Sequence, residues 1–135
     1  MRVVLRAFGT IFMSNSPHWT KTRVVIHLNP NRAVALDDTG VRDAWVTSRA
    51  PGLCIVRPYP GAPYWSITHQ PTGMGVGAHC RTLNGAKWLV IQFAACSCDW
   101  TEPNRAALER EVHDHYREYL TMMRARPEAQ VIHRT

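Results

Sequence analysis

Short runs of apolar and β-branched residues, each closed by proline, glycine or asparagine, follow one another along the chain up to residue 80. Runs of this length and composition favour strands rather than core helices. The intervening turn clusters, such as Asn29-Pro30-Asn31 and Pro71-Thr72-Gly73, bring consecutive strands side by side as an antiparallel meander that ends in a hairpin. The predicted strands are residues 23–28, 33–36, 41–47, 53–57, 64–69 and 75–80.

The residues beyond position 100 have a different periodicity. Apolar side chains such as Leu108, Val112 and Tyr119 recur every three to four positions, and charged residues fill the other positions. This pattern is typical of an amphipathic helix. With Asn104 as its N-cap, the helix is predicted to run for about five turns and to end before Pro127, which a helix interior excludes.

Residues 83–95 fit two alternatives. Asn84-Gly85 is typical of a hairpin turn, and the aromatic and β-branched residues that follow favour a buried strand. The alternative is a helix capped by Thr82 or Asn84, with apolar residues at helical spacing. That stripe consists of Ala86, Leu89, Val90, Phe93 and Ala94. Local propensity alone favours the strand slightly.

A spaced pattern joins this segment to its neighbours. The run from Trp65 to Gly73 reads W-x-x-T-H-x-x-T-G, and Asp99-Trp100-Thr101 follows later. Over about residues 64–120 the chain thereby resembles small uncharacterised proteins of actinobacterial phages and their hosts. In those proteins a hairpin precedes a helix opened by threonine, a D-W-T turn and another helix. The resemblance implies a helix at 83–95 and no particular activity.

A chain of 135 residues is long enough for one buried core and too short for two full-sized ones. We therefore expect a single α+β domain, with a small antiparallel sheet or meander and a β-hairpin followed by two C-terminal helices. Met13-Ser14-Asn15-Ser16 is typical of a protein start, which leaves Met1 and Met13 as alternatives for the first residue. The expected parts are a candidate upstream extension (1–12), a β-rich part (13–57), a rigid Pro/Gly loop (58–63), a β-β-α-α part (64–125) and a loose tail (127–135).

The charge of the chain is uneven. Its net charge is +6, and residues 1–36 carry basic side chains without any acidic one, whereas residues 99–118 carry an acidic excess. A basic segment attracts polyanions. One functional hypothesis is therefore sequence-nonspecific nucleic-acid binding through Lys21, Arg23 and Arg32, with bases stacked on exposed aromatic side chains.

The sequence also bears on location. No stretch of about 18 apolar residues is present, as a transmembrane helix would require. Arg6 interrupts the one apolar stretch near the N-terminus, so an export signal is not expected. We accordingly expect a cytoplasmic protein of a bacterial host, without a membrane partner and with its four cysteines reduced.

The cysteines and histidines are the candidate catalytic and metal-binding residues. Cys54 and Cys80 lack a recognised nucleophile signature. Cys96, Cys98 and His115 offer a weak alternative as zinc ligands, although their spacing differs from the two to four residues usual between paired cysteines. The sequence thus predicts a protein without a cofactor and without catalytic activity.

The favoured hypothesis is a non-enzymatic binding protein, of the phage accessory type, that binds and modulates a host protein. Two surfaces are candidates: the proline-aromatic loop, whose fixed φ angles lower the ordering cost of binding, and the charged face of the C-terminal helix. The oligomeric state is left open. The candidate contact residues are Tyr59, Tyr64, Trp65, Arg110, Asp114 and Arg117.

Overall fold

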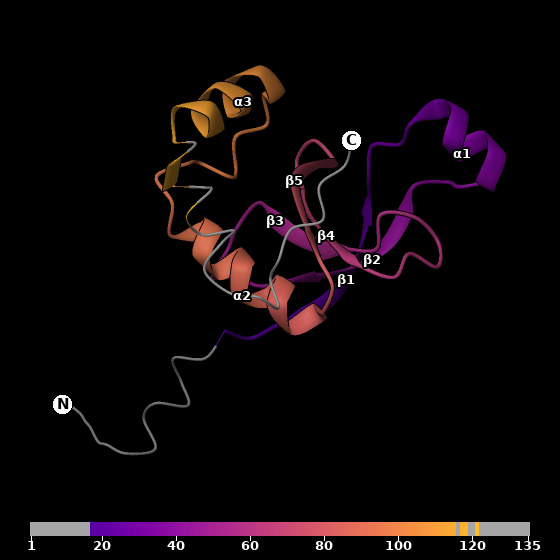
Figure 1. Ribbon diagram of the computed structural model, residues 1–135, viewed down its shortest axis with the longest axis horizontal. Helices are drawn as coiled ribbons and strands as arrows, with labels where there is room; N and C mark the ends of the chain where they lie inside the picture. The colour runs from indigo at the N-terminus through magenta and orange to yellow at the C-terminus, as the bar shows by residue number, and fades with distance from the viewer. Residues whose placement is uncertain (1–16, 116, 119–120, 122–135) are drawn as a thin grey trace, which may run out of the picture.

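The computed structural model describes residues 17–115, 117–118 and 121, and these form a five-stranded sheet with three helices (Figure 1). The α+β class and the order of hairpin followed by two helices are confirmed. The proposed extension (1–12) and tail (127–135) lie outside the described residues. The elements are β1 (Thr20–Val25), α1 (Pro30–Leu36), β2 (Val41–Val46), β3 (Leu53–Val56), β4 (Trp65–His69), β5 (Met74–Cys80), α2 (Leu83–Ala94) and α3 (Arg105–Asp114).

The sheet is an antiparallel meander in which each strand pairs with the next, in the order β1-β2-β3-β4-β5. Its two faces alternate along the strands, as the pleat requires. Leu53 and Ile55 belong to the core cluster on the α2 side, whereas Cys54 and Val56 pack with Ala44 on the other side. The sheet therefore has two buried faces.

One predicted strand is wrong. Residues 33–36 lie in the helix α1, and β1 ends at Val25 rather than at Leu28. Asn29 opens the helix, because its side-chain Oδ1 accepts a hydrogen bond from the backbone N–H of Asn31 at 3.0 Å. Pro30 follows as the first helical residue, where its fixed φ and missing N–H are tolerated. The turn predicted at these positions is the start of a helix.

The helical alternative for 83–95 is confirmed by α2. Thr82 is its N-cap, and the Thr82 hydroxyl accepts a hydrogen bond from the N–H of Gly85 at 3.0 Å. The apolar stripe faces the sheet, where Leu89, Val90 and Phe93 are fully buried. Full burial of such side chains contributes about 1.5–3 kcal/mol each, which outweighs the small local preference for a strand.

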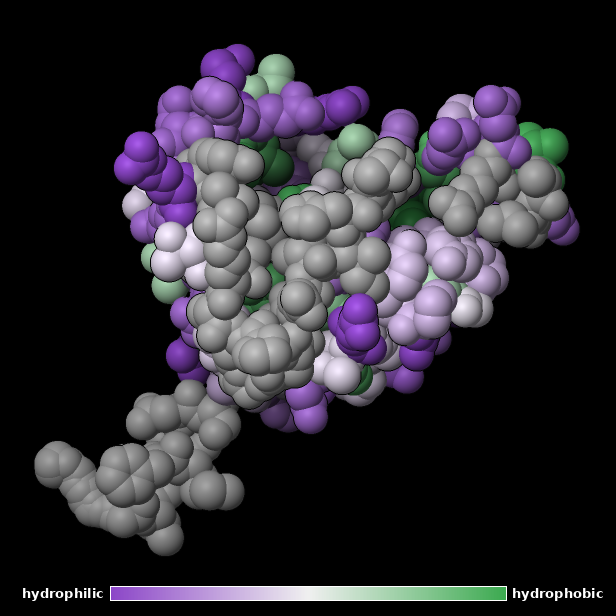
Figure 2. Space-filling view, viewed as in Figure 1, coloured by the Kyte–Doolittle hydropathy of each residue, from purple (hydrophilic) through white to green (hydrophobic). Residues whose placement is uncertain are grey.

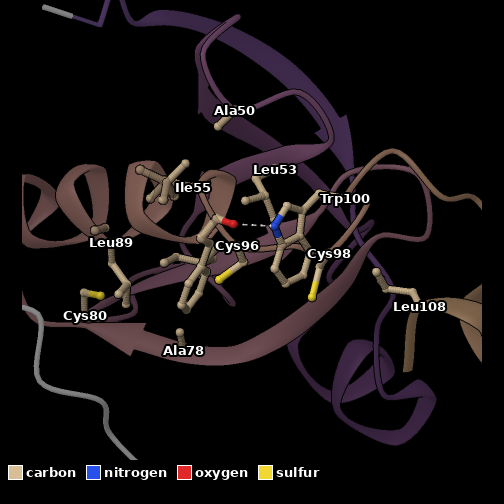
Figure 3. Close-up of a cluster of buried hydrophobic side chains, with 14 residues drawn as sticks. Ala50, Leu53, Ile55, Ala78, Cys80, Leu89, Cys96, Cys98, Trp100 and Leu108 are labelled. Carbon is tan, nitrogen blue, oxygen red and sulfur yellow. Dashed lines mark hydrogen bonds between the residues drawn. The ribbon is translucent and has the colours of Figure 1, made fainter. Parts of the chain in front are cut away.

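The main core lies between α2 and the sheet and includes the segment after α2 (Figure 3). Trp100 stacks on Phe93 with ring centroids 5.9 Å apart, and its indole N–H donates to the Phe93 carbonyl at 2.7 Å. Gly52 contacts this segment so closely that a Cβ there would lie 2.0 Å from the carbonyl oxygen of Trp100. The Asp99-Trp100-Thr101 turn is thereby fixed against the β2–β3 connection.

The last described helix is shorter than predicted. Asn104 caps α3 as expected, accepting a hydrogen bond from Ala107 N–H at 2.9 Å, but the helix ends at Asp114 with His115 as its C-cap. Residues 117, 118 and 121 are again helical, and the rest of the predicted helix lies outside the described residues. Within the part of the chain that was placed, we find no helix that could cross a membrane.

Candidate binding cleft

A cleft of about 520 Å³ lies on the face of the sheet opposite α2. One wall comes from the segment after β1 and from α1, which stands out at the upper right of Figure 2. The other wall comes from the loop between β3 and β4, and the floor comes from β4 and β5. The lining residues are Ile26–Pro30, Ala33, Asp38, Val56, Pro58, Tyr59, Tyr64, Ser66, Thr68, Gly73–Gly75, Gly77 and His79.

The first wall is held by two backbone hydrogen bonds. The N–H of Ile26 donates to the Gly40 carbonyl at 2.9 Å, and the N–H of His27 donates to the Gly73 carbonyl at 2.8 Å. The chain after β1 therefore reaches the turn between β4 and β5. Gly73 has φ +71°, and a Cβ there would lie 2.8 Å from the backbone nitrogen of His27. This close approach requires glycine.

Arg42 joins the two walls. Its guanidinium binds both carboxylate oxygens of Asp38, and it also donates to the carbonyls of Arg57 at 2.8 Å and Pro58 at 3.1 Å. Hydrogen bonds from Arg42 hold the pKa of the Asp38 carboxyl below its usual value. Asp38 is the only acidic residue among the described lining residues, and its charge is thus already paired.

An aromatic cluster forms part of the cleft lining. The Tyr64 ring stacks on His79 with centroids 4.9 Å apart and planes 27° apart, and Tyr59 meets Tyr64 edge to face at 6.1 Å. Two of the predicted contact residues, Tyr59 and Tyr64, therefore lie together. Trp65 does not join them, because it packs with the core on the opposite face and lies under the Arg57 guanidinium at 4.1 Å.

Two hydroxyl side chains form the polar floor. Ser66 and Thr68 are only 4% and 3% exposed, and both line the cleft. Neither hydroxyl oxygen is among the fully buried polar atoms of the described residues, so both open onto the cleft. Gly75 pairs with Thr68 across the strands and leaves the space beside these hydroxyls open. The sequence interpretation missed both residues, although apolar and polar side chains alternate over 65–68 in the pattern of a two-faced strand.

His69 lies outside the cleft, at the end of β4 on the core side. Its Nδ1 is 2.7 Å from the Thr72 hydroxyl, and no hydrogen bond reaches Nε2 from the described residues. Burial lowers the pKa of His69 below its usual value, while the nearby backbone of Trp100 and Glu102 acts in the opposite direction. The T-H-x-x-T spacing of the sequence pattern thus corresponds to a local contact within the hairpin.

The residues predicted on the C-terminal helix lie at a different place. Arg110 and Asp114 line a shallow groove along α3 together with Glu111 and His115. The surface of α3 is the hydrophilic region at the upper left of Figure 2. Arg117 is exposed and does not line this groove. The two predicted protein-contact surfaces are therefore separate, one at the cleft and one at α3.

The predicted nucleic-acid residues are only partly brought together. Lys21 lies on β1 with its ammonium 5.1 Å from the Trp45 ring, and Lys87 of α2 approaches the same ring at 4.7 Å and Trp19 at 5.7 Å. Arg23 pairs with Asp43 at 3.6 Å, two residues further along the strand. Arg32 belongs to α1, and its side chain lies outside the described part.

The four cysteines are buried and form no disulfide. Burial raises the pKa of the Cys54 thiol to about 12 and that of Cys80 to about 11, so both are protonated near neutral pH. Cys96 and Cys98 point into the core cluster (Figure 3). Among the described residues, no group of three or more histidine, cysteine or acidic side chains is placed to hold a metal ion.

Comparisons with known proteins return no similar chain: no protein-family model, no curated protein and no solved structure matches it.

Proposed function

We propose that this chain is a non-enzymatic binding protein that holds a segment of a partner protein in the cleft. The observation that carries the proposal is the aromatic cluster of Tyr59, Tyr64 and His79 in the lining of a cavity of about 520 Å³. Cavities of roughly 300–1,000 Å³ with aromatic walls and a few polar groups are typical ligand sites. Tyrosine is also enriched among residues that contribute most to protein interfaces.

The chemistry of the lining residues supports binding rather than catalysis. The Asp38 carboxylate is engaged by Arg42 and is therefore a poor general base. The protonated thiols of Cys54 and Cys80 are poor nucleophiles, and neither residue lines the cleft. The resemblance to phage proteins favours a host protein as the partner, consistent with a role as an accessory protein in the bacterial cytoplasm.

The test is affinity capture from host lysate by the full chain, read out by mass spectrometry with and without nuclease. Tyr59→Ala and Tyr64→Ala should each abolish capture of a nuclease-resistant protein without unfolding the chain, because they remove the aromatic wall. Arg110→Ala is the matched control, since it alters the α3 groove alone. If Arg110→Ala loses capture while both tyrosine variants keep full capture, the interface lies on α3, and the proposal that the cleft binds the partner is refuted.

Nucleic-acid binding is the second candidate, and the cluster of Trp19, Trp45, Lys21 and Lys87 favours it. Lysines beside aromatic rings are typical of surfaces that bind single strands. Titration of the chain with an oligothymidylate, followed by tryptophan fluorescence, tests this function. Lys21→Ala should weaken binding and reduce the salt slope by about 0.7. If the affinity for the oligothymidylate does not depend on salt, or if no binding occurs at low salt, the nucleic-acid-binding function is rejected.

A further inference from the structure

We propose that the cleft recognises an uncharged primary amide, such as the side chain of an asparagine or glutamine on the partner segment. This inference rests on the proposed function, because it names the group that the partner places on the floor of the cleft. It follows from three properties of the floor: two hydroxyls that open onto the cleft, a missing side chain beside them, and the absence of lysine, arginine and unpaired carboxylate groups among the described lining residues.

The hydroxyls of Ser66 and Thr68 provide the first argument. Both residues are more than nine-tenths buried and line the cleft, but neither hydroxyl oxygen is among the fully buried polar atoms of the described residues. The hydroxyls therefore open onto the cleft, and no hydrogen bond to another described residue engages them. A hydroxyl in this position can donate to and accept from a bound group.

The space beside these hydroxyls provides the second argument. A Cβ at Gly75 would lie 3.5 Å from the Ser66 Oγ, which is ordinary contact distance. A side chain at this position would therefore be accepted by the fold and would occupy the room above the Ser66 hydroxyl. The strand register is also shifted between Ser66 and Thr68, and Gly77 opposite this irregularity has φ +87°. Glycine at these positions leaves the floor accessible.

The charge of the cleft provides the third argument. No lysine or arginine is among the described lining residues, and the one carboxylate, on Asp38, is already bound by Arg42. Apart from the imidazoles of His27 and His79, the described lining residues offer an ionised group no counter-charge for the hydration that it would lose on the floor. A primary amide avoids this cost, and its C=O accepts while its NH₂ donates, which matches two hydroxyls that can each do either.

Three probes of nearly equal size test the proposal: benzamide, benzoate and benzylamine. Their phenyl ring suits the wall formed by Tyr59 and Tyr64, and they differ in charge and in hydrogen-bonding groups. Each is titrated into the full chain and followed by the backbone amide resonances of Ser66, Thr68 and Gly75. We expect benzamide to shift these resonances and to bind at least about tenfold more tightly than either charged probe.

Two variants separate a binding role from a structural one. Ser66→Ala and Thr68→Val should each weaken benzamide binding by about threefold or more while leaving the melting temperature unchanged or higher, since each removes a polar group without a partner. Ser48→Ala, in an exposed turn, is the matched control and should change neither property. Equal binding of the three probes, no binding of benzamide, or unaltered benzamide affinity in both variants would overturn the proposal. A clear loss of stability in both variants would overturn it as well.

The two proposals fail in different ways. If benzamide does not bind while Tyr64→Ala still abolishes capture of the partner, amide recognition is refuted and the proposed function stands. If benzamide binds selectively while capture does not depend on Tyr59 or Tyr64, the protein-binding role is refuted and the amide selectivity of the cleft stands on its own.

Discussion

The guanidinium of Arg42 binds both carboxylate oxygens of Asp38, at 2.8 Å and 2.6 Å, and the two side chains are 8% and 5% exposed. Asp38→Asn leaves this guanidinium buried without its counter-charge, although the carbonyls of Arg57 and Pro58 still accept from it. We expect the free energy of unfolding to fall by about 2–3 kcal/mol, measured by chemical denaturation.

The exposed pair of Arg23 and Asp43 offers a matched control on the same sheet. These side chains are 72% and 65% exposed and 3.6 Å apart. Asp43→Asn should therefore lower the free energy of unfolding by less than about 1 kcal/mol. Equal effects of the two substitutions would show that burial of Arg42 does not govern its contribution.

The buried imidazole of His69 predicts a dependence of stability on pH. Burial lowers its pKa in the folded state below the ordinary value of 6.5, so the unfolded chain takes up the proton first as the pH falls. The stabilisation is complete above about pH 6.5 and decreases below it until the folded-state pKa is reached. Denaturation between pH 8 and pH 5 should show this decrease.

The variant His69→Gln should flatten that profile, because it removes the titrating group. His113→Gln, on the exposed side of α3, should retain the profile of the original chain. A decrease that is identical in all three proteins would assign the pH dependence to other groups.

Alanine substitutions at two glycines with similar backbone angles distinguish the cost of conformational strain from the cost of a steric clash. Gly61 and Gly73 have φ +79° and +71°, but only a Cβ at Gly73 meets other atoms, at 2.8 Å from His27 N and 2.9 Å from Val25 O. Gly61→Ala should cost about 1 kcal/mol through strain alone. Gly73→Ala should cost at least about 1 kcal/mol more in the same denaturation experiment, because the segment after β1 must move. Equal costs would mean that this segment is not held against the turn.

The four thiols should be unreactive in the folded protein. Burial raises the pKa of Cys96 to about 12 and that of Cys98 to about 11, as it does for Cys54 and Cys80 at similar values. Reaction with Ellman's reagent at pH 7.5 should therefore proceed only as fast as the protein opens, and should become rapid in denaturant. A thiol that reacts at once in the native protein would contradict this burial.

The sequence predicts most of the strands, and its errors have physical causes. The run Ala33–Leu36 has the composition of a short strand, but Asn29 and Pro30 begin a helix through side-chain capping and a preset φ. Asn29 and Pro30 therefore mark the start of a helix, although Asn29-Pro30-Asn31 also has the composition of a turn. At 83–95 the local strand preference was misleading, because contact of the apolar stripe with the sheet decides the outcome and is not a local property.

The candidate site was predicted less completely than the fold. Tyr59 and Tyr64 lie in the proline-rich loop, where exposure can be inferred from composition, and they do meet. Trp65 was grouped with them although neighbouring residues on a strand point to opposite faces. Ser66 and Thr68 could not be identified as floor residues without knowing that the segment after β1 crosses to Gly73, since that contact joins distant parts of the sequence.

The meander also has a kinetic consequence. Because every strand pairs with its sequence neighbour, the sheet can assemble one hairpin at a time, and each pairing closes a shorter loop than pairing between distant strands would. The hydrogen bond between His27 and Gly73 is an exception, since it closes a long loop that encloses β2, β3 and β4. The sheet should consequently form early in folding and the cleft late, so that a nascent or partly unfolded chain would have its strands in place before it could hold a ligand.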